Sequence, residues 1–214
     1  MDFYGIMALA RRGIAAVCGC PRHLRESEDL TVSVLFINAC VRQNSRTLAL
    51  ANSMMKDMQG EIICVNLAAE NIAPLDGATL EKRERLVREG RWEDPMFRYA
   101  TQFAAADEIV IAAPFWDLSF PAMLKIYLEQ ITVAGITFRY TDGRPTGLCK
   151  AEMLTYVTTS GGPIVEDFGY AYVKTLAKSF YGIPKTVAVR AMNLDVDMIS
   201  AQELLARAAI SVIE

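Results

Sequence analysis

The strongest constraint on the fold is a regular alternation of short apolar runs with helical patterns, which starts near residue 31 and continues to the C-terminus. The first run, 32–37, is almost continuously apolar and rich in β-branched residues, as is typical of a strand buried on both faces of a sheet. Strands that alternate with helices predict an α/β fold, in which helices cover both faces of a parallel sheet. The predicted strands span 32–37, 61–67, 108–113, 153–159 and 186–189.

Helices are predicted where apolar residues recur three and four positions apart, in several cases ahead of a glycine that can end the helix. The last of them opens with Ser200 and Glu203, a capping box in which each side chain can bond a free backbone N–H group. Residues 136–140 and the turn at 141–143 predict an extended excursion with a turn. The predicted helices span 48–58, 80–89, 96–106, 121–134, 172–180 and 200–208.

The composition excludes several classes of protein. The chain has 214 residues, 22 of them basic and 25 acidic, so its net charge is -3, and it has no long basic run. It therefore lacks the electrostatic footprint of a protein that binds nucleic acid or an anionic membrane surface. No stretch approaches the roughly 20 apolar residues that span a bilayer. We expect neither a nucleic-acid partner nor a membrane partner.

The cysteines and the single histidine limit the chemistry. Five cysteines, odd in number and unevenly spaced, argue against a disulfide framework and favour a reducing cytoplasm. Cys18 and Cys20 with nearby His23 lack a convincing fourth ligand, so no metal site is expected. Because His23 is the only histidine, a cofactor is expected to carry the chemistry of any enzyme built on this chain.

The N-terminal residues differ from the rest of the chain. Residues 1–29 show neither clean helical nor strand periodicity and end in a polar run at 25–29. We interpret them as an extension ahead of the folded domain. No linker, internal repeat or low-complexity tract follows, so residues 30–214 are predicted to form one domain.

Three loops follow predicted strands, at 38–47, 114–120 and 159–166, and ligands of parallel α/β sheets bind outside the carboxyl ends of the strands. The first loop carries arginine, amide and hydroxyl side chains ahead of a helix start, where backbone N–H groups and the helix dipole favour a phosphate. It contains no glycine, so it is neither a P-loop nor a dinucleotide-binding loop. The alternative is an ordinary capped helix with exposed arginines.

The other two loops suggest a flat ligand. Loop 114–120 places Phe115, Trp116 and Phe120 at a strand end, a position that usually faces solvent. A conjugated ring resting against these side chains would explain them; the alternative is that they pack beneath the next helix. In the third loop, Gly161 and Gly162 allow the backbone to approach a ligand closely, although paired glycines also mark ordinary turns.

Three stretches together resemble the FMN-dependent NAD(P)H:quinone oxidoreductase and azoreductase family. They are AAPFWDLSFPAMLK at 112–125, AGITFRYT at 134–141 with GL at 147–148, and TSGG at 159–162. The similarity covers about Val32 to the C-terminus in the same order. It implies a three-layer, doubly wound, flavodoxin-like fold with a five-stranded parallel sheet in the order 2-1-3-4-5. It also implies FMN at the carboxyl edge of that sheet and a homodimer.

The resemblance implies roles for individual residues. Phe138 would wall the pocket for the nicotinamide or the quinone, and Tyr140 would line the same pocket. NADH or NADPH would reduce the flavin and leave before a quinone, azo or nitroaromatic acceptor takes the electrons, in a ping-pong sequence. The residues expected to bind FMN are Arg42, Asn44, Ser45 and Thr47 at the phosphate, Pro114, Phe115, Trp116, Asp117 and Leu118 along the ring, and Thr159, Ser160, Gly161 and Gly162 at the pyrimidine side.

Some positions depart from the pattern of the family. Asp117 stands where azoreductases commonly have Asn, and a carboxylate facing the ring would lower the redox potential of the flavin. Cys40 stands where related phosphate loops often have Ser, which would remove a hydroxyl donor, and AMN at 191–193 replaces the more usual AEG. The sequence favours neither NADH nor NADPH. A flavodoxin-type electron carrier and a flavin-based redox sensor remain open as alternatives to the enzyme.

Overall fold

The computed structural model describes residues 32–195 and 211–213. The predicted N-terminal extension, 1–29, and the predicted helix at 200–208 lie outside the described residues. All described secondary structure belongs to the unit Thr31–Glu214. Its strands and helices alternate along the chain as the sequence predicts.

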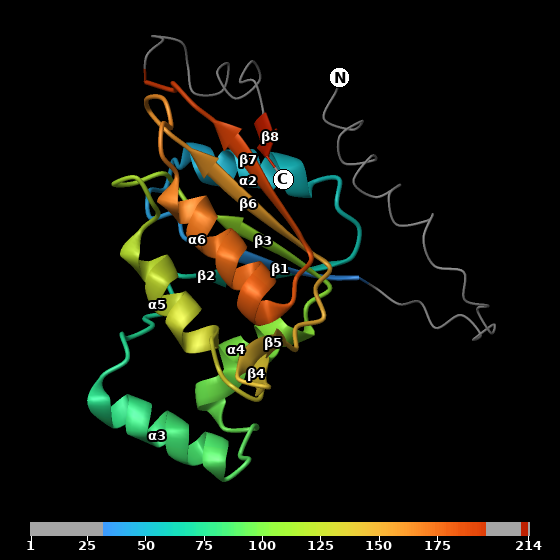
Figure 1. The fold of residues 1–214 in the computed structure, drawn as a ribbon. Helices are drawn as coiled ribbons and strands as arrows, with labels where there is room; N and C mark the ends of the chain where they lie inside the picture. The colour runs from blue at the N-terminus through green and yellow to red at the C-terminus, as the bar shows by residue number, and fades with distance from the viewer. Residues whose placement is uncertain (1–31, 196–210, 214) are drawn as a thin grey trace, which may run out of the picture. The chain divides into compact units, whose positions relative to one another are not determined.

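One sheet forms the centre of this unit (Figure 1). Its strands are β1 (Ser33–Asn38), β2 (Glu61–Asn66), β3 (Glu108–Ala112), β6 (Met153–Thr159), β7 (Lys185–Ala191) and β8 (Ser211–Ile213). Their order in the sheet is β2-β1-β3-β6-β7-β8, and the pairs from β2 to β7 are parallel. The predicted order 2-1-3-4-5 is therefore confirmed. The sequence did not predict β8, which adds a short antiparallel edge to β7.

The helices agree with the predicted ones in number and order within the described residues. They are α2 (Arg46–Met55), α3 (Gly77–Arg88), α4 (Arg98–Ala105), α5 (Ala122–Ile131) and α6 (Phe168–Leu176), with a 3-10 turn at Pro95–Phe97 and a π-helical turn at Ala177–Tyr181. The α3 helix begins three residues before the predicted Leu80. Its start is set by Asp76, whose side chain accepts a hydrogen bond of 2.7 Å from the backbone N–H of Thr79.

The helices form two layers around the sheet. In Figure 1, α5 and α6 lie in front of the sheet and α2 lies behind it. Side chains of α4, α5 and α6, among them Phe103, Tyr127 and Val173, share one apolar core with Leu35 and Ile37 of the interior strand β1. Each such buried side chain contributes about 1.5–3 kcal/mol relative to an exposed one. Strand β1 is buried because helices cover both faces of the sheet. The sheet is therefore a rigid support for the loops at its carboxyl edge.

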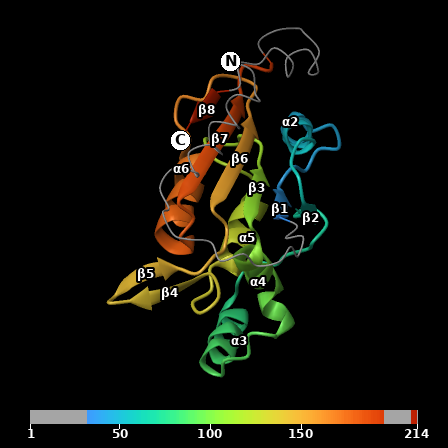
Figure 2. The same cartoon turned by 90° about the vertical axis from the view of Figure 1, so that its right-hand side faces the viewer.

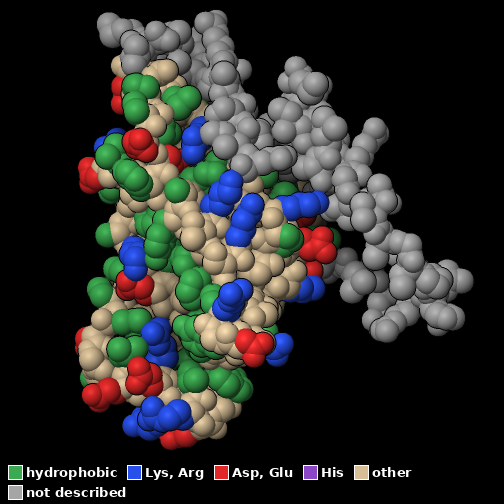
Figure 3. All heavy atoms as spheres, viewed as in Figure 1, with side chains coloured by type: hydrophobic (Ala, Val, Ile, Leu, Met, Phe, Trp, Pro, Cys, Tyr) green, Lys and Arg blue, Asp and Glu red, His purple; other side chains and the backbone are tan. Residues whose placement is uncertain are grey.

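The outer surface is polar and of mixed charge. The α3 helix buries only Leu86, and Figure 3 shows basic and acidic side chains interspersed over it and over neighbouring surface. Within 32–195 and 211–213, no helix has the length and apolar character needed to cross a bilayer.

The predicted excursion after α5 is a two-stranded hairpin, β4 (Phe138–Thr141) paired antiparallel with β5 (Arg144–Gly147). Its turn holds Asp142 and Gly143 at φ values of 52° and 73°, the left-handed backbone that a two-residue hairpin turn requires. Figure 2 shows the hairpin away from the carboxyl ends of β6 and β7.

Two buried tyrosines allow a matched test of the core. The Tyr127 hydroxyl has no hydrogen-bond partner among the described residues. The Tyr181 hydroxyl lies 2.7 Å from Thr132 Oγ1, and because Thr132 donates its own proton to Leu128 O, Tyr181 is the donor. Tyr181→Phe should therefore lower the free energy of unfolding by about 1 kcal/mol, whereas Tyr127→Phe should leave it unchanged or raise it slightly. Urea unfolding followed by circular dichroism measures both; a larger loss for Tyr127→Phe would contradict this assignment.

Candidate functional site

A cavity of about 230 Å³ lies where the carboxyl ends of the strands meet the start of α2. It gathers residues from all three predicted loops and from the loop after β7. The residues that line it are Val41, Arg42, Asn44, Ser45, Arg46, Thr47, Pro114, Phe115, Trp116, Thr159, Gly161 and Asp195. Most residues predicted to bind the cofactor line this one cavity, while Asp117, Leu118, Ser160 and Gly162 are not among them.

One end of the cavity is built to hold an anion. Ser45 caps α2: its backbone is extended, and its Oγ accepts a hydrogen bond of 3.2 Å from the N–H of Leu48. The first N–H groups of a helix have no partner within the helix, and the helix dipole adds positive potential there. Arg42 and Arg46 add two cationic side chains to the wall, and Asn44 adds an amide. This combination suits a phosphate.

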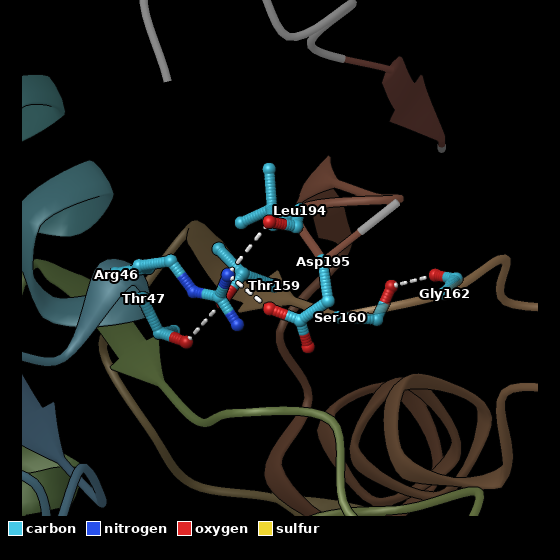
Figure 4. A network of polar contacts seen from close by, with 7 residues as sticks. All are labelled: Arg46, Thr47, Thr159, Ser160, Gly162, Leu194 and Asp195. Carbon is cyan, nitrogen blue, oxygen red and sulfur yellow. Dashed lines mark hydrogen bonds and ion pairs between the residues drawn. The ribbon is translucent and has the colours of Figure 1, made fainter. Parts of the chain in front are cut away.

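Thr47 makes a contact that the sequence did not predict. Its hydroxyl lies 2.6 Å from that of Thr159, and both side chains are buried. The pair joins the first turn of α2 to the end of β6 (Figure 4). Thr47 lines the cavity, and its hydroxyl pair with Thr159 holds two walls of the cavity together.

The aromatic loop forms another wall. The backbone N–H of Phe115 donates to Thr159 O over 3.1 Å, which sets this loop beside the end of β6. Trp116 and Ser119 exchange both backbone hydrogen bonds, over 3.1 and 2.7 Å, and so close a two-residue turn. Phe115 and Trp116 line the cavity, as a flat ligand would require. Phe120 instead packs against the core near Tyr172. For Phe120 the alternative holds, in which the aromatic side chain packs into the protein rather than against a ligand.

The turn itself is strained. Asp117 and Leu118 have φ values of 48° and 63°, in the left-handed region that non-glycine residues seldom adopt. Leu118 O accepts a hydrogen bond of 3.0 Å from Phe168 N at the start of α6, which helps to hold this geometry. Strained backbone of this kind is found where the surrounding structure fixes a binding loop.

Two of the positions that depart from the family pattern, Asp117 and Cys40, are not among the residues that line the cavity. Asp117 is exposed at the tip of the turn. Cys40 is buried and directs its thiol to Ala112 O at 3.7 Å, and burial raises the pKa of that thiol. The thiol also lies close enough to Ser45 and to the backbone of Leu48 for both to lower its pKa, which places it beside the start of α2.

The glycine loop after β6 is held by the loop after β7. Ser160 O, Gly161 O and Gly162 O accept backbone hydrogen bonds of 2.9–3.2 Å from residues 193–195, and the Ser160 hydroxyl donates to Gly162 O over 2.5 Å. Ser160 is therefore a structural residue of this loop. A Cβ atom on Gly161 would lie 2.0 Å from Asp195 Oδ2, so only glycine fits at this position with Asp195 where it is.

A buried ion pair anchors the far side of the same loop. Arg190 of β7 lies 2.7 Å from Asp167, and both side chains are largely buried. Asp167 also caps α6 by accepting a hydrogen bond of 2.8 Å from Tyr170 N. Loop 159–166 is thus tied to the sheet at one end by the β6–β7 pairing and at the other by this pair. Removing one partner of a buried pair is strongly destabilising, so the loop has little freedom.

Sequence reasoning missed Arg46 and Asp195. Arg46 Nη1 donates to Asp195 Oδ1 over 2.6 Å and to Leu194 O over 2.9 Å, across one side of the cavity (Figure 4). The Arg46 guanidinium holds the pKa of the Asp195 carboxyl below its usual value. The signal for Asp195 was its place just beyond the carboxyl end of the last predicted strand, where loops of this fold meet ligands.

Phe138 and Tyr140 lie on the hairpin, and neither lines the cavity of this chain. The α5 helix carries the chain from the carboxyl end of β3 to the other end of the sheet before the hairpin begins (Figure 2). Phe138 is buried against Phe180, whereas Tyr140 is exposed. Their predicted role at the substrate pocket is not explained by their position within one chain.

A parallel sheet of this order, with a helix N-terminus and an aromatic loop at its carboxyl edge, defines a flavodoxin-like protein. A family model described as "Flavodoxin-like fold" matches residues 33–213. The chain is 36% identical over 176 residues to FMN-dependent NADH:quinone oxidoreductase 2 of Clostridium acetobutylicum, covering 76% of this chain and 87% of that protein. It is 34% identical over 180 residues to FMN-dependent NADH:quinone oxidoreductase of Clostridium perfringens, covering 79% and 90%.

Solved structures agree on the fold. A structure titled azoreductase from Bacillus anthracis superposes with a TM-score of 0.69 at 20% identity, covering 82% of this chain and 94% of that one. A structure of an FMN-dependent NADH-azoreductase from Bacillus anthracis in complex with FMN gives a TM-score of 0.65 at 23% identity, covering 82% and 93%. The chain belongs to the flavodoxin-like fold family, together with the FMN-dependent NADH:quinone oxidoreductases that it resembles in sequence.

The helix cap at the anion end can be tested by stability. Ser45→Ala removes the side chain that caps α2 and should lower the free energy of unfolding by about 1 kcal/mol, whereas Ser45→Gly should cost only a few tenths. Ser53→Ala, on the exposed face of the same helix, is the matched control and should be neutral or slightly stabilising. Equal losses at Ser45 and Ser53 in urea unfolding would mean that Ser45 does not act as a cap.

Proposed function

We propose that this protein is an FMN-dependent NADH:quinone oxidoreductase. The observation that carries the proposal is a single cavity in which a helix N-terminus with two arginines faces an aromatic loop. The names of its relatives in Clostridium acetobutylicum and Clostridium perfringens support the same activity and favour NADH as the donor. Both relatives are matched over most of their own length.

The donor set of the cavity fits FMN, which combines a phosphate with a flat conjugated ring. Arg42, Asn44 and Ser45, with the first N–H groups of α2, would hold the phosphate. The segment Pro114–Trp116 supplies apolar and aromatic surface for a ring. Gly161, which has no side chain to obstruct it, lets backbone N–H and C=O groups approach the ligand closely.

Bound FMN would supply the redox chemistry, taking a hydride from NADH and passing two electrons to the acceptor. The chain supplies binding, orientation and electrostatics. Among the described residues that line the cavity, the ionisable side chains are the two arginines Arg42 and Arg46 and the carboxylate Asp195. Phe115 and Trp116 limit the access of water to the ring side of the cavity.

The same proposal extends to the order of events and the acceptor. We expect NADH and the acceptor to use one site in turn, which gives ping-pong kinetics, because both must reach the same flavin ring in the cavity at the carboxyl edge of the sheet. Azo and nitroaromatic compounds are also flat acceptors that can pack against an aromatic wall. Because the structural relatives are titled azoreductases, azo compounds are the first of these acceptors to test. NADPH is the alternative donor to compare with NADH.

We also propose a homodimer in the cytoplasm. Exposed apolar side chains gather beside the cavity, where Leu118 is 50% exposed and Phe168, bonded to it through the backbone, is 57% exposed. Apolar patches of this kind on a soluble protein commonly mark an interface. Free thiols at Cys40, Cys64 and Cys149 suit a reducing compartment.

The proposed function is tested by cofactor binding and turnover together. Purified protein should bind FMN, and anaerobic NADH should bleach the flavin absorbance, which a quinone should then restore. Trp116→Ala should weaken binding of both FMN and riboflavin about tenfold, since a stacking aromatic contributes of the order of 1 kcal/mol. Trp92→Ala, which removes an equally exposed tryptophan outside the cavity, is the control and should leave flavin affinity unchanged.

The outcomes separate the alternatives. Protein that binds no flavin would refute the proposal. Flavin that binds but is not bleached by NADH or NADPH would favour an electron carrier or a redox sensor.

A further inference from the structure

A carboxylate already pairs with one of the arginines at the anion end of the cavity. Arg46 is the first residue of α2, so its guanidinium lies where the helix N-terminus and its dipole also favour an anion. Asp195 Oδ1 lies 2.6 Å from Arg46 Nη1 (Figure 4). Arg42 also stabilises the ionised form of Asp195. The Asp195 carboxylate therefore forms with Arg46 the kind of ion pair that an oxygen of a bound phosphate would form.

The carboxylate sits in space that the backbone leaves open. Its Oδ2 occupies the position next to Gly161 that any larger residue would fill. The backbone around it is fixed, because Asp195 N donates to Gly161 O over 2.9 Å and Leu194 N donates to Ser160 O over 3.1 Å. The side chain of Asp195, in contrast, is 66% exposed. Rotation about its Cα–Cβ bond would therefore separate the carboxylate from Arg46 without moving either loop, and Arg46 would keep its hydrogen bond to Leu194 O.

A phosphate and Asp195 cannot share Arg46 without repulsion. A phosphate monoester carries between one and two negative charges near neutral pH. Two like charges a few ångströms apart repel each other, and the exposed setting reduces this repulsion without removing it. Among the described residues, no cationic side chain other than Arg42 and Arg46 lines the cavity to neutralise both anions. A bound phosphate must therefore either displace the carboxylate from Arg46 or bind more weakly beside it.

We propose that Asp195 is an internal competitor for the phosphate group of the cofactor, which neutralises Arg46 until a phosphate displaces it. This inference rests on the proposed function, because it assigns a residue that tunes the affinity and selectivity of that same site. The pairing makes the site selective among anions. An anion of low charge gains little binding free energy when it displaces the carboxylate from Arg46, whereas a phosphate monoester gains more. Asp195 is thus a specificity residue that acts through Arg46.

The test compares Asp195→Asn with Asp57→Asn. Asp57 is exposed just beyond the other end of α2, so its replacement changes the net charge equally but away from the cavity. The Kd values of FMN and of riboflavin, which lacks the phosphate, are measured by quenching of flavin fluorescence. Asp195→Asn should lower the Kd of FMN about two- to fivefold, the range of an exposed ion pair, and leave that of riboflavin unchanged. Asp57→Asn should change neither.

Two further measurements locate the effect. The gain from Asp195→Asn should shrink as salt is raised, because the repulsion that it removes is solvent-exposed. In an Arg46→Met background, Asp195→Asn should give a smaller gain, since the two residues act on each other. Full additivity of the two substitutions in this cycle would overturn the proposal.

A structural role for Asp195 predicts a different result. If Asp195 only braces the two loops, Asp195→Asn should lower the melting temperature and weaken FMN and riboflavin alike, and this outcome would overturn the inference. Inorganic phosphate, titrated by calorimetry, separates the inference from the proposed function. If neither flavin binds to the wild-type protein, the proposed function fails, while tighter phosphate binding by Asp195→Asn would still support competition and unchanged binding would refute it.

Discussion

The site depends on the reversal of strand order between β1 and β3. From β1 the chain moves to β2 on one side, and from β3 it moves to β6 on the other, so the loops after β1 and β3 leave the sheet in opposite directions. A crevice opens where such loops part, and parallel strands deliver every loop to the same edge. The helix start at Arg46 and the aromatic segment at 114–116 face one cavity for this reason. The remaining contacts hold the edges of that crevice in place.

The crevice is held by polar contacts that are local to its walls. The Thr47–Thr159 hydroxyl pair joins the first loop to the third, and Phe115 N bonds Thr159 O to join the second. The Arg190–Asp167 pair fixes the far end of the third loop. A site that offers no histidine can still support redox chemistry if it positions a cofactor accurately, because the cofactor brings the reactivity and the protein supplies geometry and charge. The strained turn at Asp117 and Leu118 is consistent with such positioning.

The charge balance of the cavity follows from the same contacts. Two arginines would give a strongly attractive anion site, yet the backbone bonds of residues 193–195 bring an acidic side chain against one of them. The result is a site whose attraction for anions is moderated by its own chain. Moderate retention suits a noncovalently bound cofactor, and it couples the loop after β7 to the first turn of α2, two segments separated by about 150 residues in sequence.

The resemblance of the sequence to a known family implied the order of the strands. The sequence by itself determined the class of the fold and the three loops that line the cavity. Local periodicity and turn residues encode these features, and the parallel α/β topology then places the loops at one edge. The tertiary structure decided which way side chains point and what they meet. Cys40 turned to β3, the Thr47 hydroxyl paired with Thr159, and the hairpin with Phe138 lay away from the cavity. The short strand β8 and the Arg46–Asp195 pair depend on contacts between distant segments, which no local pattern specifies.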